Sequence, residues 1–234
     1  HQEARRQRQM CIRDRIHSAW GTFEWLLTDG FPLGHRSGVV CNSDGHKGRP
    51  GASYPGAATF GAYGGLTCFL THDLTRDGIF ECLRSRHHYG TTGCRMHLEV
   101  KVHCKEQAIF YHQDPKAYRD SKTSKVWEVM MGDIVETREN EVMLSLKILA
   151  HAPLERVEIR NGSEVCSIHR PFDASDLGSR IRVIWSGAEY RGRGRQTSWK
   201  GRADFQHCQI LKMKKINAWN HEKRLQACGT KSVE

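Results

Sequence analysis

The chain has 234 residues, of which 38% are hydrophobic and 26% are charged, and its formal net charge is +10. This composition is typical of a globular protein with a sizeable core, and it excludes an intrinsically disordered chain. No apolar run approaches the roughly 20 residues that a membrane-spanning helix needs, so the sequence predicts no membrane segment.

Residues 1–15, HQEARRQRQMCIRDR, form a polar and arginine-rich leader without the apolar core of a signal peptide. Its end, QMCIRDR, resembles a peptide that arises when sequencing-adapter DNA is translated; in that case the protein's own sequence begins near Ile16. The alternative is a solvated basic arm. On either interpretation we expect residues 1–15 to be disordered and to pack against nothing, because they hold too few apolar side chains to offset the entropy of ordering.

Between residues 16 and 94 the patterns of strands and helices alternate. The sequence predicts a strand that ends at Ser18, a helix over Thr22–Leu27, buried strands within 35–43 and 64–72, and a second helix that begins after Thr75. This order favours a parallel sheet or barrel, with the strands in 35–43 and 64–72 as parallel neighbours or near neighbours.

From about residue 95 the pattern changes to alternation with a period of two. Strands are predicted within 96–104, 142–150, 154–168 and 179–190, and the Asn-Gly pair at 161–162 is typical of a hairpin turn. We therefore expect a second, mostly antiparallel β domain over residues 95–234.

Asp44 and His46 follow the predicted strand within 35–43, and Lys47 and Arg49 come directly after them. In parallel α/β folds functional residues gather in the loops after the strands, so this carboxylate and this imidazole are candidate ligands of zinc, manganese or iron. Lys47 and Arg49 would then bind a phosphate or carboxylate group of a small anionic substrate. The simpler interpretation is that Asp44 forms a turn and His46 is solvated.

Four segments of the chain resemble an uncharacterised bacterial family related to the PHP (polymerase and histidinol phosphatase) metal-dependent phosphoesterases. The matching segments are HSAWGTFEWLL, VVCNSDGHKGRPGASYPGAATFGAYGGLTCFL, LTRDGIFECLRSRHHYGTTG and RIRVIWSGAEYRGRGRQTSWKG. The resemblance implies that Asp44 and His46 are the last metal-ligand motif of a distorted (β/α)7 barrel. The predicted fold class is thus α/β followed by mostly β: the last βα units of a PHP-like barrel over 16–94, then the antiparallel domain.

The family's HxH pair, which supplies its first metal ligands, has no counterpart before Asp44. The resemblance therefore implies a fragment of a metal-dependent hydrolase that lacks the N-terminal half of its own barrel, and we expect it to be inactive and to bind no metal stably. Two further residues are candidates: His17, as an additional ligand or a structural residue, and Tyr54, as a lining of the substrate site or a residue that packs its loop.

Two different functions remain open beside the hydrolase. A basic binding module for polyanions is suggested by the net charge and by Arg191–Arg195, RGRGR, with Trp185 and Trp199 as stacking partners. Because the positive charge is spread along the chain, nucleic acid is disfavoured as the partner. The second possibility is a structural β domain without catalysis.

The cysteines bear on the compartment. Their number, nine, is odd and they form no CxxC pair, which excludes a zinc knuckle and a thioredoxin-type motif. Unpaired cysteines and the lack of a signal peptide favour a reducing, cytoplasmic compartment.

Overall fold

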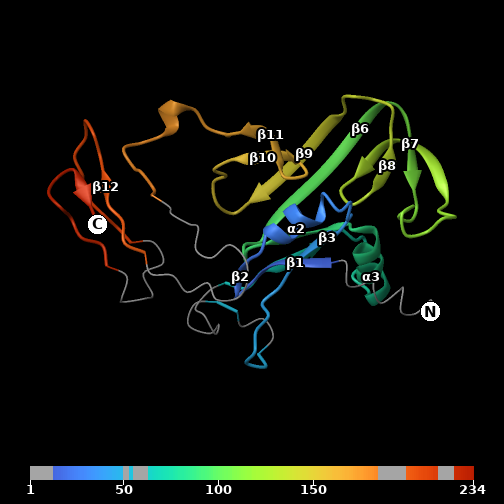
Figure 1. The fold of residues 1–234 in the computed structure, drawn as a ribbon, viewed down its shortest axis with the longest axis horizontal. Helices are drawn as coiled ribbons and strands as arrows, with labels where there is room; N and C mark the ends of the chain where they lie inside the picture. The colour runs from blue at the N-terminus through green and yellow to red at the C-terminus, as the bar shows by residue number, and fades with distance from the viewer. Residues whose placement is uncertain (1–12, 50–52, 55–62, 184–198, 216–223) are drawn as a thin grey trace. The chain divides into compact units, whose positions relative to one another are not determined.

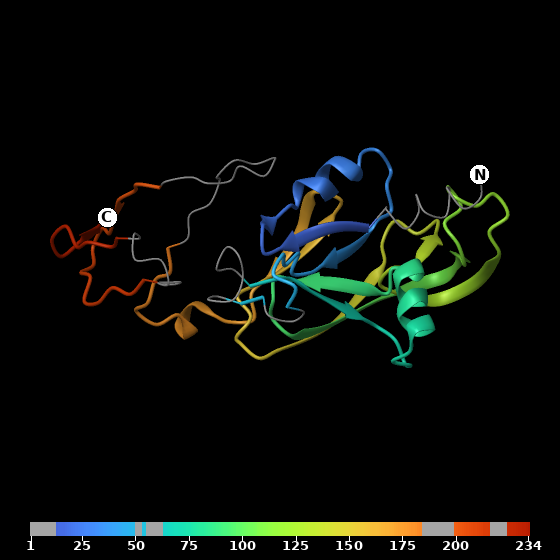
Figure 2. The same ribbon diagram turned by 90° about the horizontal axis from the view of Figure 1, so that it is seen from below.

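The structure is a computed structural model that describes residues 13–49, 53–54, 63–183, 199–215 and 224–234. The chain divides into two compact units, His1–Arg182 and Val183–Glu234. Figures 1 and 2 show the ribbon in two views. The candidate site residues all belong to the first unit.

A small three-stranded sheet begins the first unit. It consists of β1 (Arg13–Ser18), β2 (Gly21–Thr22) and β3 (Gly38–Cys41) in the order β2-β1-β3. β2 is antiparallel to β1, whereas β3 is parallel to β1 and is reached through helix α2 (Trp25–Gly30). This sheet brings the ends of β1 and β3 to one edge, which is where the candidate ligands lie.

The next elements form a two-stranded sheet with a helix inserted between its strands. β4 (Leu66–Phe69) pairs antiparallel with β5 (His88–Thr91), and α3 (Arg76–Ser85) lies between them in the sequence. The hydroxyl of Thr75 accepts a hydrogen bond from the backbone amide of Gly78, which caps the start of α3. Arg86, with φ 62°, ends the helix in the left-handed conformation.

Strands β3 and β5 approach one another closely because glycines line the contact. A Cβ atom on Gly38 would lie 2.7 Å from the His88 ring, and one on Gly90 would collide with the sulfur of Cys41. The Thr67 hydroxyl donates to the carbonyl of Cys41 at 2.7 Å and accepts from its amide at 2.9 Å, which joins β4 to β3. The two small sheets therefore share one core around the buried Cys41.

The largest sheet has four antiparallel strands around the long strand β6 (Met96–Tyr111). On one side β6 pairs with β7 (Thr123–Met130); on the other it pairs with β9 (Met143–Ala150) along its first half and with β8 (Ile134–Glu136) near its end. Cys104, Ala108 and Val129 are buried in this sheet.

The remaining elements are short. β10 (Val157–Asn161) and β11 (Glu164–His169) form a hairpin whose turn contains Gly162 with φ 61°, and a 3-10 turn covers Ala174–Asp176. In the second unit, β12 (Ala203–Asp204) pairs antiparallel with β13 (Ser232–Val233).

The predicted α/β fold class is wrong. The described residues are mostly β, with only the two helices α2 and α3, and their strands are divided among several small sheets rather than arranged as a barrel. The strands within 35–43 and 64–72 are not parallel partners in a common sheet: β3 pairs with β1, and β4 pairs antiparallel with β5.

The physical reason lies in the connection between β4 and β5. Phe69, at the end of β4, lies opposite His88, at the start of β5. The chain thus leaves and returns at the same end of the sheet, which produces an antiparallel hairpin with a helical insertion. A parallel βαβ unit would have required the chain to travel back along the sheet before the second strand.

Several local expectations are confirmed. The helix after Thr75 is present, and strands occupy the predicted ranges 96–104 and 142–150 together with the hairpin around Asn161–Gly162. In the range 179–190, residues 179–183 are not in a strand, and the others lie outside the described residues.

The expectation for the leader is wrong in one part. Arg13–Arg15 pair with Gly38–Val40 in the parallel β1–β3 ladder, so this end of the leader does not stand apart from the fold. Residues 1–12 lie outside the described residues.

Candidate metal and anion site after β3

The candidate site lies where the parallel strands β1 and β3 end side by side. The amide of Asn42 donates to the carbonyl of His17 at 3.1 Å, and the amide of Ala19 donates to the carbonyl of Ser43 at 3.1 Å. These bonds continue the ladder past the end of β3 and fix the first residues of the loop that carries Asp44 and His46.

Asp44 turns the chain out of the sheet. Its φ of 49° lies in the left-handed region, which aspartate adopts more readily than most residues. Its backbone carbonyl accepts hydrogen bonds from Nδ1 of His46 at 2.7 Å and from the indole nitrogen of Trp20 at 3.4 Å. The turn thus holds the His46 ring against the backbone of Asp44.

The His46 ring is oriented in a way that suits a metal ligand. Because Nδ1 donates to a carbonyl, the neutral ring carries its proton there and its lone pair on Nε2. Ligating histidines in proteins commonly make such a bond from the nitrogen that does not bind the metal. The edge of Trp20 lies against the ring, with centroids 5.4 Å apart and planes at 70°, and the side chain remains exposed.

His17, the third candidate ligand, uses both of its ring nitrogens within the protein. Nε2 lies 3.4 Å from the carbonyl of Tyr63, to which it donates, and Nδ1 lies 2.8 Å from the hydroxyl of Thr22, from which it accepts. Burial lowers the pKa of His17, and the bond with Tyr63 opposes that effect. His17 in β1 is therefore bonded to β2 through Thr22 and to the segment before β4 through Tyr63.

The candidate anion-binding residues lie in the exposed loop after His46. Lys47 and Arg49 are exposed and form no ion pair with a described residue. Tyr54 is also exposed, at 53%. Gly64 donates to the carbonyl of Ser53 at 3.0 Å, which closes the neck of this loop; residues 50–52 and 55–62 lie outside the described part.

The described residues do not complete a metal shell. Within them, no group of three or more His, Cys, Asp or Glu side chains is placed to hold a metal ion. Asp44 and His46 are joined through the Asp44 backbone carbonyl, and their side chains belong to no such group among the described residues.

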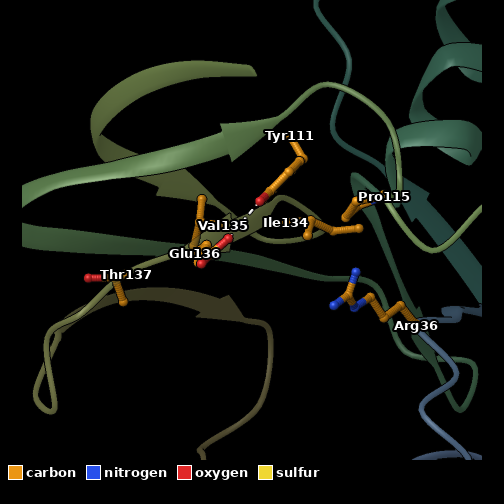
Figure 3. Close-up of a pocket in the computed structure, with 7 residues that line it drawn as sticks. All are labelled: Arg36, Tyr111, Pro115, Ile134, Val135, Glu136 and Thr137. Carbon is orange, nitrogen blue, oxygen red and sulfur yellow. Dashed lines mark hydrogen bonds between the residues drawn. The ribbon is translucent and has the colours of Figure 1, made fainter. Parts of the chain in front are cut away.

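A shallow pocket occurs elsewhere, along β6 and β8 (Figure 3). Its volume is about 410 Å³, and it is lined by Arg36, Tyr111, Pro115, Ile134, Val135, Glu136 and Thr137. Its charged groups are already bonded: Arg36 pairs with Asp114 at 2.9 Å, and the Tyr111 hydroxyl donates to Glu136 at 2.6 Å, which raises the pKa of Tyr111. Sequence reasoning did not find this pocket, because Arg36 and Tyr111 are far apart in the chain and belong to no motif.

The adjacent histidines at the start of β5 have structural roles. Nε2 of His87 lies 2.7 Å from the carboxylate of Asp133, and Nδ1 of the buried His88 donates to the carbonyl of Val39 at 2.9 Å. Each histidine joins β5 to a different part of the first unit.

Three further findings concern the polyanion hypothesis, the cysteines and membrane insertion. The segment Arg191–Arg195, on which the polyanion hypothesis rests, lies outside the described residues.

All the described cysteines are free thiols. Neither α2 nor α3, nor any other described helix, is long and apolar enough to span a bilayer.

Comparison of the chain with protein-family models, with curated proteins and with solved structures found no match.

Proposed function

We propose that this chain supplies Asp44 and His46 to the divalent-metal site of a hydrolase that acts on small phosphoesters. The observation that carries the proposal is the hydrogen bond from His46 Nδ1 to the Asp44 carbonyl, at the edge where β1 and β3 both end. It leaves Nε2 of an exposed imidazole as the donor atom, two residues after a carboxylate. The resemblance of this segment to the metal-ligand motif of PHP-related phosphoesterases supports the same assignment.

In this proposal Lys47 and Arg49 bind the phosphate of the substrate. Both are exposed, both follow the ligands within three residues, and neither is engaged by a described carboxylate. Arginine forms paired hydrogen bonds with phosphate oxygens, whereas lysine acts as a point charge. A bound zinc, manganese or iron ion would polarise the phosphoryl group and activate water.

Two donors make a weak site, so the chain by itself should bind metal weakly and hydrolyse nothing. Affinity and turnover would both require further ligands, which the described residues do not provide. In this proposal metal binding and catalysis therefore require further ligands in addition to Asp44 and His46.

The test is zinc binding by calorimetry to the wild-type chain and to Asp44→Ala, His46→Ala and His72→Ala. His72 is an exposed histidine in another loop and serves as the matched control. We expect each of the first two substitutions to weaken zinc binding by roughly tenfold or more, and His72→Ala to leave it unchanged. Equal affinity in all four proteins would refute the assignment.

Activity is tested in a protein that carries this segment together with further metal ligands. There, Asp44→Ala and His46→Ala should remove bound metal and the hydrolysis of 4-nitrophenyl phosphate together, while Arg49→Ala should raise KM with the metal retained. Loss of activity with full metal occupancy in His46→Ala would contradict the ligand role.

A further inference from the structure

Strand β9 presents an unpaired edge and exposed apolar side chains on both of its faces. One edge of β9 pairs with β6 from Met143 to Ala150, and Figure 1 shows the two strands side by side. Among the described strands no other pairs with β9. Six of its eight residues are exposed, including Met143 at 65% and Leu149 at 69%. Such an edge is a template for pairing with another strand.

Natural edge strands are usually protected against pairing by proline, by bulges or by several charges. β9 has the sequence MLSLKILA, with no proline and one charge, Lys147, and its ladder with β6 runs without a break in register. Its edge is therefore long and regular, and no described strand pairs with it.

We propose that β9 pairs antiparallel with β9 of a second copy of this chain, about a two-fold axis through Leu146. The two faces of the strand differ, and this limits the possible registers. Leu144, Leu146 and Ile148 share one face with Val102, Val100 and Leu98 of β6, which lie directly opposite them. Because directly opposed residues point to the same side of a sheet, only a register that pairs even-numbered residues with one another continues this apolar face into the second copy.

Among those registers, the one centred on Leu146 also matches the side chains. It places Leu144 opposite Ile148 and Leu146 opposite its own copy on the apolar face, and Met143 opposite Leu149 on the other face. Lys147 then lies opposite Ser145, whereas a register centred on Lys147 would bring two like charges together. The Leu146-centred register therefore pairs the two most exposed apolar side chains of β9 with each other and avoids repulsion between the lysines.

This pairing is isologous, as a two-fold dimer requires, and would join two four-stranded sheets into one continuous sheet. It is independent of the metal site, since Asp44 and His46 follow β3 in a different sheet.

The test introduces a positive or a negative charge at one exposed position, Ser145. Dimer dissociation constants are measured by sedimentation equilibrium for the wild type, Ser145→Lys and Ser145→Glu. In the proposed register residue 145 meets Lys147 of the other copy twice, so Ser145→Lys should weaken the dimer at least tenfold and Ser145→Glu should tighten it severalfold. The double variant Ser145→Lys/Lys147→Glu should recover the affinity that Ser145→Lys loses.

Ser167→Lys is the matched control, because Ser167 is an exposed serine of strand β11; it should leave the dissociation constant unchanged. Circular dichroism confirms that each variant is folded. A wild-type chain that remains monomeric at all concentrations would overturn the proposal. Weaker dimers with Ser145→Glu would overturn the register, because they would indicate that residue 145 meets itself.

Discussion

The imidazole of His87 lies 2.7 Å from the carboxylate of Asp133 and so fastens the start of β5 to the turn between β7 and β8. The other carboxylate oxygen of Asp133 accepts a hydrogen bond from the backbone amide of Met130 at 2.9 Å. In the same region Nε of Arg86 donates to the carbonyl of Gly132 at 3.0 Å. One aspartate thus serves two segments that are more than 40 residues apart.

Replacement of Asp133 should therefore destabilise the fold. Asp133→Ala removes both acceptors from a largely buried carboxylate, and we expect a loss of about 1–3 kcal/mol in the free energy of unfolding. Asp133→Asn should cost less, because the amide oxygen still accepts from Met130. Urea denaturation measures both, with the exposed Asp120→Ala as control; an unfolding free energy of Asp133→Ala equal to that of the control would contradict the role.

The close approach of β3 and β5 predicts a large effect of a single methyl group. Gly38→Ala would place a Cβ 2.7 Å from the His88 ring, and we expect it to destabilise the protein by about 1–3 kcal/mol. Gly178→Ala is the control, since nothing lies within 4 Å of the added atom. Thermal unfolding should show a lower Tm for Gly38→Ala only.

The same interface allows a test of coupling. In Gly90→Ala the added methyl meets the Cys41 sulfur, so removal of that sulfur by Cys41→Ala should relieve part of the strain. The double variant Gly90→Ala/Cys41→Ala should then be more stable than the sum of the single effects allows. Strict additivity in a double-mutant cycle would show that the two residues do not compete for space.

Glu139 should make stability depend on pH in the acidic range. Its carboxylate accepts hydrogen bonds from the amides of Glu106 at 2.6 Å and Lys105 at 3.0 Å, which lower its pKa below 4.5. A carboxyl group with a lowered pKa in the folded state stabilises that state above about pH 4.5 and loses this contribution as the pH falls through the folded value. Urea midpoints between pH 6 and 3 should therefore fall more steeply for the wild type than for Glu139→Gln, with the exposed Glu164→Gln following the wild type.

His17 should act in a higher pH range. Burial lowers the pKa of His17 from 6.5, so the folded state favours the neutral ring. The free energy of unfolding therefore keeps its full value above about pH 6.5 and declines as the pH falls below it. His17→Gln, which cannot titrate, should lose less stability than the wild type between pH 7 and 5. Identical slopes for the two proteins would mean that the ring titrates equally in the folded and unfolded states.

Local features of the fold were predictable because their causes are local. Thr75 and the apolar positions Ile79 and Leu83 suffice to specify α3. Alternation of apolar and polar residues over 96–104 and 144–148 indicates the first half of β6 and the middle of β9. The pairing of β4 with β5 was not predictable, because a strand–helix–strand pattern is equally compatible with a parallel crossover and with an antiparallel hairpin that contains a helical insertion. Only the position of His88 opposite Phe69 distinguishes them.

The candidate site shows the same division. The position of Asp44 and His46 directly after a buried strand followed from the sequence, but the bond between the His46 ring and the Asp44 carbonyl depends on a left-handed turn at Asp44. The two bonds of His17 involve Thr22 and Tyr63, and only folding brings Tyr63 to β1. The contact between Arg36 and Asp114 likewise joins distant segments and left no sequence signal.

The length of β6 has a consequence for how the protein is synthesised. The end of β6 pairs with β7, and the partners Tyr111 and Thr123 are near one another in the sequence, so they can pair soon after both have left the ribosome. The β6–β9 partners nearest in sequence, His103 and Met143, are 40 positions apart. At a translation rate of about 5–20 residues per second, the first half of β6 waits several seconds for β9. During that interval Leu98, Val100 and Val102 border an open edge of a nascent sheet, and this is the segment that a chaperone would have to protect.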